Sequence, residues 1–287
     1  MSRYKPEKLT VEFRKGVTET VPVIPGRYTL TNSDITAESF LTIGPDYAFD
    51  NNAMEYHVLI DEKIGDVTGD GVPDWVSLYG DRMTASPYVT NIRLEVEDGQ
   101  TGFKIDIDTG LSGYNPTLFL GDFTKDKIDD IKLSMDAGGS GGYGIFAVYT
   151  CINDELNTVF TSDGYNSEYQ YMVEYRDLYK VGISNEMLNR LFTLDISDKG
   201  YDYLSQFYNL NGILIKPVNG EVLALGALIP IIGSEKDNSF DLLAFQRIIG
   251  STNADTLGHI ENLLSWDGER FASIRMTASV PGTDLIM

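Results

Sequence analysis

The sequence predicts an all-β protein built from repeated four-stranded antiparallel units, and three observations support this fold class. The composition combines 17 Tyr and 13 Phe with 28 Gly, which is typical of many short strands joined by turns. Two Asp-rich loops begin 56 positions apart, at Asp66 and Asp122, within the range of periods that indicates propellers and repeat arrays. Each loop is followed, at a nearly constant distance, by a hairpin-type turn.

The first loop, Asp66–Asp74, carries oxygen-bearing side chains at its positions 1, 3, 5 and 9. Ca²⁺ takes roughly six to eight oxygen ligands at about 2.3–2.6 Å, so this spacing predicts a calcium site. The candidate ligands are the side chains of Asp66, Thr68, Asp70 and Asp74 and the backbone carbonyl of Val72. Gly71 stands sixth, where the backbone must turn sharply.

The second loop, Asp122–Asp130, repeats the pattern. Its candidate ligands are the side chains of Asp122, Thr124, Asp126 and Asp130 and the carbonyl of Ile128. Lys127 takes the place of the sixth-position glycine, and a side chain there resists a turn with positive φ. We therefore expect the second site to be weaker or slightly different in shape.

Neither loop matches an EF-hand, although the EF-hand uses the same opening spacing. An EF-hand adds a bidentate Glu at position 12 and a helix on each side. Here position 12 is Ser77 in the first loop and Leu133 in the second, and a short β-prone run follows each loop. We expect both loops to lead into strands.

A degenerate third copy is predicted two periods after the second loop, around position 234. Gly233 stands where the first Asp is expected, and the weaker metal candidates there are Glu235, Asp237 and Asp241. The intermediate copy, expected near Leu178, has no ligand set.

The turns that follow the loops complete the repeat. Asp98-Gly99 begins 24 positions after Asp74, Asn153-Asp154 begins 23 after Asp130, and Asp267-Gly268 begins 26 after Asp241. Asp-Gly between alternating runs is a strong hairpin signal. One repeat is therefore strand, Asp-rich loop, strand, polar or Gly-rich connection, strand, turn, strand, which is the strand order of a propeller blade.

The repeat length sets the expected domain organisation. At this spacing the chain holds about five units, in a closed ring or an incomplete one. We expect a β-propeller-like domain over 56–287, and an extended N-terminal arm or a further degenerate unit over 1–55. The clear units lie near 56–110 and 112–165, and the degenerate ones near 166–220 and 221–287.

The stretch from Asp122 to Tyr149 resembles the FG-GAP, or VCBS-type, repeats of integrin α-chain β-propellers and of many bacterial proteins. In that family an Asp-rich Ca²⁺ loop is followed by a strand, a Gly-containing connection and an aromatic strand, and residues 130–133 and 144–149 match these parts. The tripeptide that names the family is absent, and Ser134-Met135-Asp136 takes its place. The resemblance implies a bacterial, integrin-like, calcium-binding propeller.

Charge limits the class of partner. With 43 acidic and 22 basic residues, the chain has a formal net charge of −21 and offers no basic surface that would release phosphate counterions, so we expect no nucleic-acid partner. The first ten residues contain no apolar segment, so we expect neither a signal peptide nor membrane insertion. Cell-surface, spore-surface, extracellular and cytoplasmic locations all stay open.

No catalytic residue stands out. Two His residues and the single Cys151 cannot build a zinc site without carboxylates, and no G-x-S-x-G follows a strand. The run Gly138–Gly142 lacks the Lys-Ser/Thr and the helix of a phosphate-binding loop, so we expect an inter-strand connection there. Eight Tyr between Tyr165 and Tyr208 either pack between units or form a recognition surface.

These observations favour a non-catalytic, calcium-binding module for protein or carbohydrate recognition or for surface assembly, in which the metal fixes the loops. The alternative is a propeller-based enzyme that acts on a polysaccharide. Such an enzyme would need two carboxylates on either side of a cleft, outside the Asp-rich loops.

Overall fold

The chain divides into two compact units, Met1–Asn52 and Ala53–Met287. The computed structural model describes residues 8–13, 17–22, 39–41, 55–83, 86–234, 236 and 238–282. The described part of the smaller unit contains β1 (Lys8–Phe13), β2 (Val17–Pro22) and β3 (Ser39–Leu41), in an antiparallel sheet of order β2-β1-β3. The expected arm or degenerate unit thus contains a small sheet.

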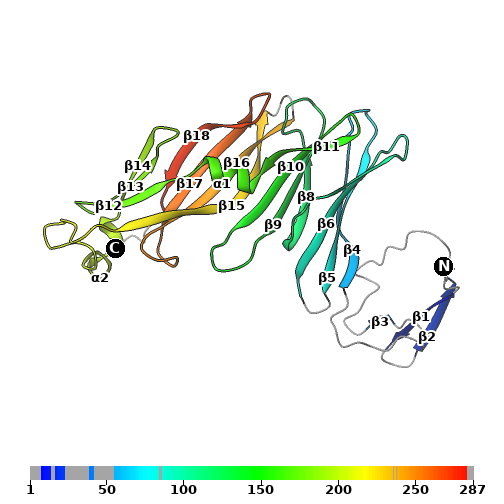
Figure 1. Ribbon diagram of the computed structural model, residues 1–287, viewed down its shortest axis with the longest axis horizontal. Helices are drawn as coiled ribbons and strands as arrows, with labels where there is room; N and C mark the ends of the chain where they lie inside the picture. The colour runs from blue at the N-terminus through cyan, green and yellow to red at the C-terminus, as the bar shows by residue number, and fades with distance from the viewer. Residues whose placement is uncertain are drawn as a thin grey trace. The chain divides into compact units, whose positions relative to one another are not determined.

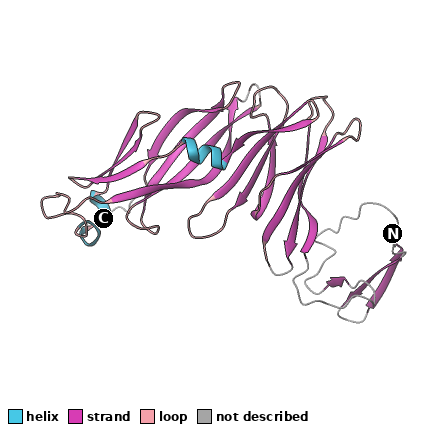
Figure 2. Ribbon diagram, in the orientation of Figure 1, coloured by secondary structure: helices cyan, strands magenta, loops and turns pink. Residues whose placement is uncertain are grey.

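The larger unit is all-β, as predicted, and its described residues form an eight-stranded and a seven-stranded antiparallel sheet (Figures 1 and 2). Its described helices are short: α1 (Ser162–Glu168), the 3₁₀ turn η1 (Ser197–Lys199) and α2 (Tyr201–Leu204). Thr161 caps α1, because its hydroxyl accepts a hydrogen bond from Gly164 N. α1 contacts both β10 and β15, one strand from each sheet.

The first sheet contains two four-stranded meanders, β4–β7 and β8–β11. Its strands are β4 (Glu55–Gly65), β5 (Asp74–Met83), β6 (Tyr88–Glu97), β7 (Lys104–Asp108), β8 (Gly113–Gly121), β9 (Asp130–Asp136), β10 (Gly144–Ile152) and β11 (Glu155–Thr161). β8 pairs with β6 through only two residue pairs, at Tyr88 and Val89. Farther along β8, Leu118 N donates a hydrogen bond to Asp61 Oδ2 of β4 at 2.8 Å, so the two meanders also contact each other through β4 and β8.

The second sheet combines a third meander, β15–β18, with the three-stranded β12–β14. Its strands are β12 (Met172–Arg176), β13 (Lys180–Asn185), β14 (Arg190–Asp195), β15 (Asn219–Ser234), β16 (Ser239–Ile249), β17 (Thr256–Trp266) and β18 (Phe271–Ser279). β12 joins β15 at Val173 and Glu174.

The predicted strand order of the repeat is confirmed in all three meanders. Asp98-Gly99, Asn153-Asp154 and Asp267-Gly268 lie in the β6–β7, β10–β11 and β17–β18 connections. Asn153 and Asp154 both have positive φ, 53° and 61°, as a two-residue hairpin turn of type I′ requires. Successive units are joined by backbone pairing, however, so the described strands form two continuous sheets.

Each meander buries its apolar side chains against a neighbour. One cluster lies between the first two meanders and includes Leu78, Leu94 and Leu133. A second lies between β10 and the β15–β18 meander and includes Phe123 and Leu242. Successive side chains of β10 point alternately into the first and the second cluster. The strand is buried at seven of its nine positions, because it has a packed layer on both faces.

Cys151 lies in the first cluster and offers a probe of its integrity. Burial raises the pKa of its thiol to about 11, so the group is protonated as well as covered. We expect the native thiol to react with a disulfide reagent at pH 8 at least about a hundredfold more slowly than in denaturant, because reaction requires opening of the sheet. Absorbance of the released thiolate measures the rate. Glu155→Cys in a Cys151→Ala background is the exposed control, and equally fast reaction of the native Cys151 would contradict this packing.

Candidate functional site

The first Asp-rich loop joins β4 to β5 and is organised by its own carboxylates. Gly69 N donates to Asp66 Oδ1 at 2.7 Å, and Gly71 N donates to Asp66 Oδ2 at 2.9 Å. Val72 N donates to Asp70 Oδ1 at 2.7 Å. These bonds satisfy loop amides that no sheet partner could reach.

Asp74, the last candidate ligand of this loop, is completely buried. Its Oδ2 accepts hydrogen bonds from Val67 N and Thr68 N, both at 2.9 Å, and its Oδ1 accepts one from Gly99 N at 3.0 Å. The carboxylate therefore ties the loop to the β6–β7 turn. In contrast, the buried Thr68 Oγ1 has no hydrogen-bond partner among the described residues.

The second loop joins β8 to β9 and repeats this network. Asp126 N and Lys127 N each donate to Asp122 at 3.1 Å, and Ile128 N donates to Asp126 Oδ1 at 3.0 Å. Lys125 and Lys127 have φ of +63° and +75°, values close to those of Gly69 and Gly71 in the first loop. The expectation that Lys127 would change the shape of the loop is not supported at the level of the backbone, because both lysines adopt the left-handed conformation.

Asp130 is the counterpart of Asp74 and is 1% exposed. It accepts hydrogen bonds from Phe123 N at 2.8 Å, Thr124 N at 2.7 Å and Thr124 Oγ1 at 3.0 Å. Burial raises its pKa to about 6, against the opposing effect of these hydrogen bonds. Unlike Thr68, Thr124 uses its hydroxyl within the loop.

The two loops lie against each other. Asp129 N donates to the carbonyl of Asp66 at 3.0 Å, and the Ile128 side chain covers Gly69, where an added Cβ would lie 2.5 Å from Ile128 Cδ1. The pKa of Asp129 is raised by burial and by the nearby charges of Asp122 and Asp66. Negative charge from both loops is therefore concentrated at one edge of the first sheet.

The third candidate set is only partly described, because Glu235 and Asp237 lie outside the described residues. Asp241 is buried, and its Oδ1 lies 3.0 Å from Lys125 Nζ of the second loop. Lys125 also donates to Ser265 Oγ, and Phe240 N donates to the carbonyl of Asp122 at 2.8 Å. Asp241 thus already has a cationic partner, and the second loop contacts both sheets.

As they stand, the described residues bring together no group of three or more Asp, Glu, His or Cys side chains suited to hold a metal ion. Several of the carboxylate oxygens instead face loop amides. One observation does fit a cation: Thr68 Oγ1 is a buried oxygen that no other described residue satisfies.

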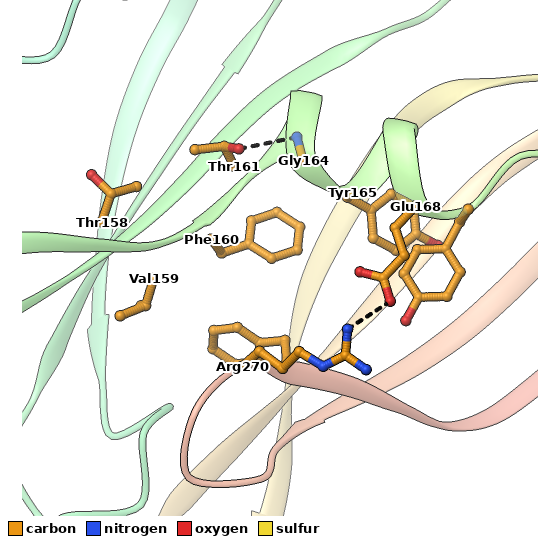
Figure 3. A pocket seen from close by; sticks show the side chains of 10 residues that line it. Thr158, Val159, Phe160, Thr161, Gly164, Tyr165, Glu168 and Arg270 are labelled. Carbon is orange, nitrogen blue, oxygen red and sulfur yellow. Dashed lines mark hydrogen bonds and ion pairs between the residues drawn. The ribbon is translucent and has the colours of Figure 1, made fainter.

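A cavity of about 270 Å³ lies away from the loops, between β11, α1 and the start of β18 (Figure 3). Glu168 and Arg270 form an ion pair across it, with Oε1 and Nη1 3.2 Å apart. Among the described residues Glu168 is the one carboxylate that lines it, so the cavity does not offer the pair that glycoside hydrolysis needs. Glu168 and Arg270 are 102 positions apart, and no sequence signal connects them.

The Tyr-rich stretch is mostly packing. Tyr165 and Tyr169 are buried in the second apolar cluster. Tyr175 and Tyr208 are buried in a third cluster, which joins β12 and β13 to β16 and β17, whereas Tyr201 is 71% exposed. Tyr201 lines a groove of about 610 Å³ with Tyr179, Tyr208, Ser197 and Asn209. The groove offers aromatic faces beside hydroxyl and amide groups.

Within the described residues, the helices are all too short or too polar to cross a bilayer.

Comparison with known proteins finds two matching family models and a bacterial relative. The family model of the YybI C-terminal domain matches residues 169–279, which include the whole second sheet, and that of the Staygreen protein matches residues 3–70. The chain is 40% identical over 241 residues to the uncharacterized protein YybI of Bacillus subtilis (strain 168). The aligned region covers 83% of this chain and 91% of that protein. No solved structure matches.

The predicted membership of the FG-GAP or VCBS family is wrong, because the matching family models are those of the YybI C-terminal domain and the Staygreen protein. The physical reason lies in the loops themselves. Alternating Asp side chains satisfy the amides of any tight hairpin loop, so the spacing describes a local structure and not a family.

Glycine replacements test the contact between the loops. Gly71→Ala meets no atom within 4 Å but keeps φ at +86°, so we expect a loss of about 1 kcal/mol from backbone strain alone. Gly69→Ala adds the clash with Ile128 and should cost more. Urea unfolding measures both. Lys127→Gly is the reverse control and should leave stability unchanged or raise it slightly; equal losses for the two alanine variants would show that the loops do not pack together.

Proposed function

The chain belongs to the YybI family, and we propose that it is a non-catalytic, calcium-binding module that recognises a protein or carbohydrate ligand. The observation that carries the proposal is the pair of matching Asp-rich loops in direct contact at one sheet edge. At this contact the pKa of Asp129 is raised by burial and, to a smaller extent, by the negative charges of Asp122 and Asp66.

The residues of the first loop fit a calcium ion better than those of the second. Asp66, Thr68, Asp70, Asp74 and the carbonyl of Val72 would hold the ion, and a bound Ca²⁺ would supply positive charge where the carboxylates repel one another. Within the described part of the chain Thr68 Oγ1 has no competing partner, whereas Thr124 Oγ1 already donates to Asp130. In the second loop Asp122, Thr124, Asp126, Asp130 and Ile128 would form the weaker site.

Recognition is assigned to the Tyr-lined groove beside α2. Tyr faces with neighbouring Ser and Asn groups suit the apolar faces and hydroxyls of a sugar as well as a peptide, and the exposed Leu210 extends the same groove. In this proposal the three meanders are propeller-like units, and calcium fixes the hairpin loops that hold the first two against each other.

Calcium should stabilise the fold measurably. At 100 times its Kd, Ca²⁺ would add about 2.7 kcal/mol per site to the free energy of unfolding, seen as a higher urea midpoint than in EDTA. Asp70→Asn keeps an oxygen that can accept the Val72 N–H but removes the charge, so it should reduce the effect of Ca²⁺ more than the stability in EDTA. Asp202→Asn, an exposed acid on α2, is the matched control. Identical midpoints in Ca²⁺ and EDTA would overturn the proposal.

Two threonine variants should behave in opposite ways in EDTA. Thr68→Val removes a buried hydroxyl that has no hydrogen-bond partner among the described residues, so we expect unchanged or higher stability in EDTA but a weaker response to Ca²⁺. Thr124→Val removes a donor to Asp130 and should cost about 1–3 kcal/mol even in EDTA. Urea unfolding in EDTA and in a calcium series measures both. A Thr68→Val variant with a normal calcium response would show that this hydroxyl is not a ligand.

A further inference from the structure

A second groove, of about 640 Å³, lies between the β9–β10 connection and the outer face of the second sheet. Its lining joins the Gly-rich connection to the small and apolar residues of β15 and β16 and to two basic side chains: Ser140, Gly141, Gly142, Ala224, Gly226, Ala227, Ile229, Phe245, Arg247 and His259. Small residues at 224, 226 and 227 leave the space open. Both ionisable lining residues are basic, in a chain with a net charge of −21.

Arg247 is held in place by neutral acceptors. Its Nη1 donates to the carbonyl of Asn253 at 2.8 Å, and its Nη2 donates to Asn253 Oδ1 at 2.6 Å. Asn253 Nδ2 in turn donates to the carbonyl of Ser140 at 3.1 Å, and Arg247 Nη2 reaches the carbonyl of Gly141 at 3.5 Å. The guanidinium is therefore oriented against the Gly-rich connection.

The described residues supply no counterion for this positive charge. Among the described residues, no carboxylate lies within ion-pair distance of Arg247 or of His259, its register partner on β17. The next charged residue along β17, Glu261, is not part of the lining. Arg247 Nη1 also donates to Thr256 Oγ1 at 3.1 Å, so Nε remains as its free donor within the described part of the chain. Ser140 and Gly141 form a turn that directs the Gly142 N–H toward the carbonyl of Gly139, whereas the Gly141 N–H has no backbone acceptor among the described residues.

We propose that this groove binds a small organic anion, with its carboxylate or phosphate group near Arg247, His259 and the Gly141 amide. Phe245 and Ile229 would cover the apolar part of the ligand. The volume is in the usual range for small-molecule sites, roughly 300–1,000 Å³. The run Gly138–Gly142 contains no basic residue that could bind an anion. Arg247 of β16 supplies the positive charge beside it.

The proposal is tested by calorimetric titration of the full chain with phenyl phosphate, benzoate and the neutral benzamide. We expect one-to-one binding of at least one anion and no measurable binding of benzamide. Arg247→Met should weaken binding at least about tenfold, because a charged hydrogen-bonding partner is lost. The tighter of the two anions identifies the group that the site prefers.

Two further variants make the result decisive. Arg275→Met removes the same charge from an exposed position on β18, so it should leave binding within about twofold. Ala227→Leu fills the groove, leaves Arg247 in place and should abolish binding. This variant tests the site even if Arg247→Met does not fold. Equal losses for Arg247→Met and Arg275→Met, or no binding of either anion at millimolar concentration, would overturn the proposal. Titrations in Ca²⁺ and in EDTA should agree, so failure here is distinct from failure of the calcium proposal.

Discussion

The larger unit depends on the backbone hydrogen bonds of the β8–β9 loop. On one side Asp129 N donates to the carbonyl of Asp66, and on the other Phe240 N donates to the carbonyl of Asp122. A short loop can contact both neighbours in this way only if its remaining amides are satisfied internally, and Asp122 and Asp130 do this. The loop therefore connects the first meander, the second meander and the β15–β18 meander.

The same arrangement creates an electrostatic cost. Carboxylates that accept loop amides must stay near one another, and burial of Asp130 and Asp129 raises the pKa of each, which means that their charged forms are disfavoured. The chain compensates at one point with its own cation, because Lys125 reaches Asp241 across the junction of the sheets. At the first loop it has no equivalent lysine contact among the described residues, and this is where the proposed calcium ion would act.

The two proposed ligands have opposite charge and use different parts of the repeat. The hairpin loops concentrate acids, whereas the β9–β10 connection contains glycines and is approached by Arg247. A cation site and an anion site on one small domain are compatible because each depends on local fields, which fall off over about 8–10 Å at moderate ionic strength. The acidic net charge also lowers nonspecific anion binding elsewhere on the surface.

Local chemistry was readable from the sequence. Strand order within each repeat followed from Asp-rich loops and hairpin turns, because turn residues act on their own backbone: Asn153 and Asp154 both adopt the left-handed conformation that a tight hairpin turn needs. The same locality explains the wrong family assignment, since loop spacing says nothing about how units are joined.

Tertiary structure alone decided which residues meet. Backbone pairing of β6 with β8 and of β12 with β15 merged the repeats into two sheets, and no periodicity records such contacts. Arg247 meets Gly141 from 106 positions away, and Lys125 meets Asp241 from 116, because packing of separate meanders brings them together. The sequence by itself determined the hairpins and their carboxylates; the contacts between hairpins, which create the charge cluster and the basic groove, exist only in the folded protein because they depend on long-range burial.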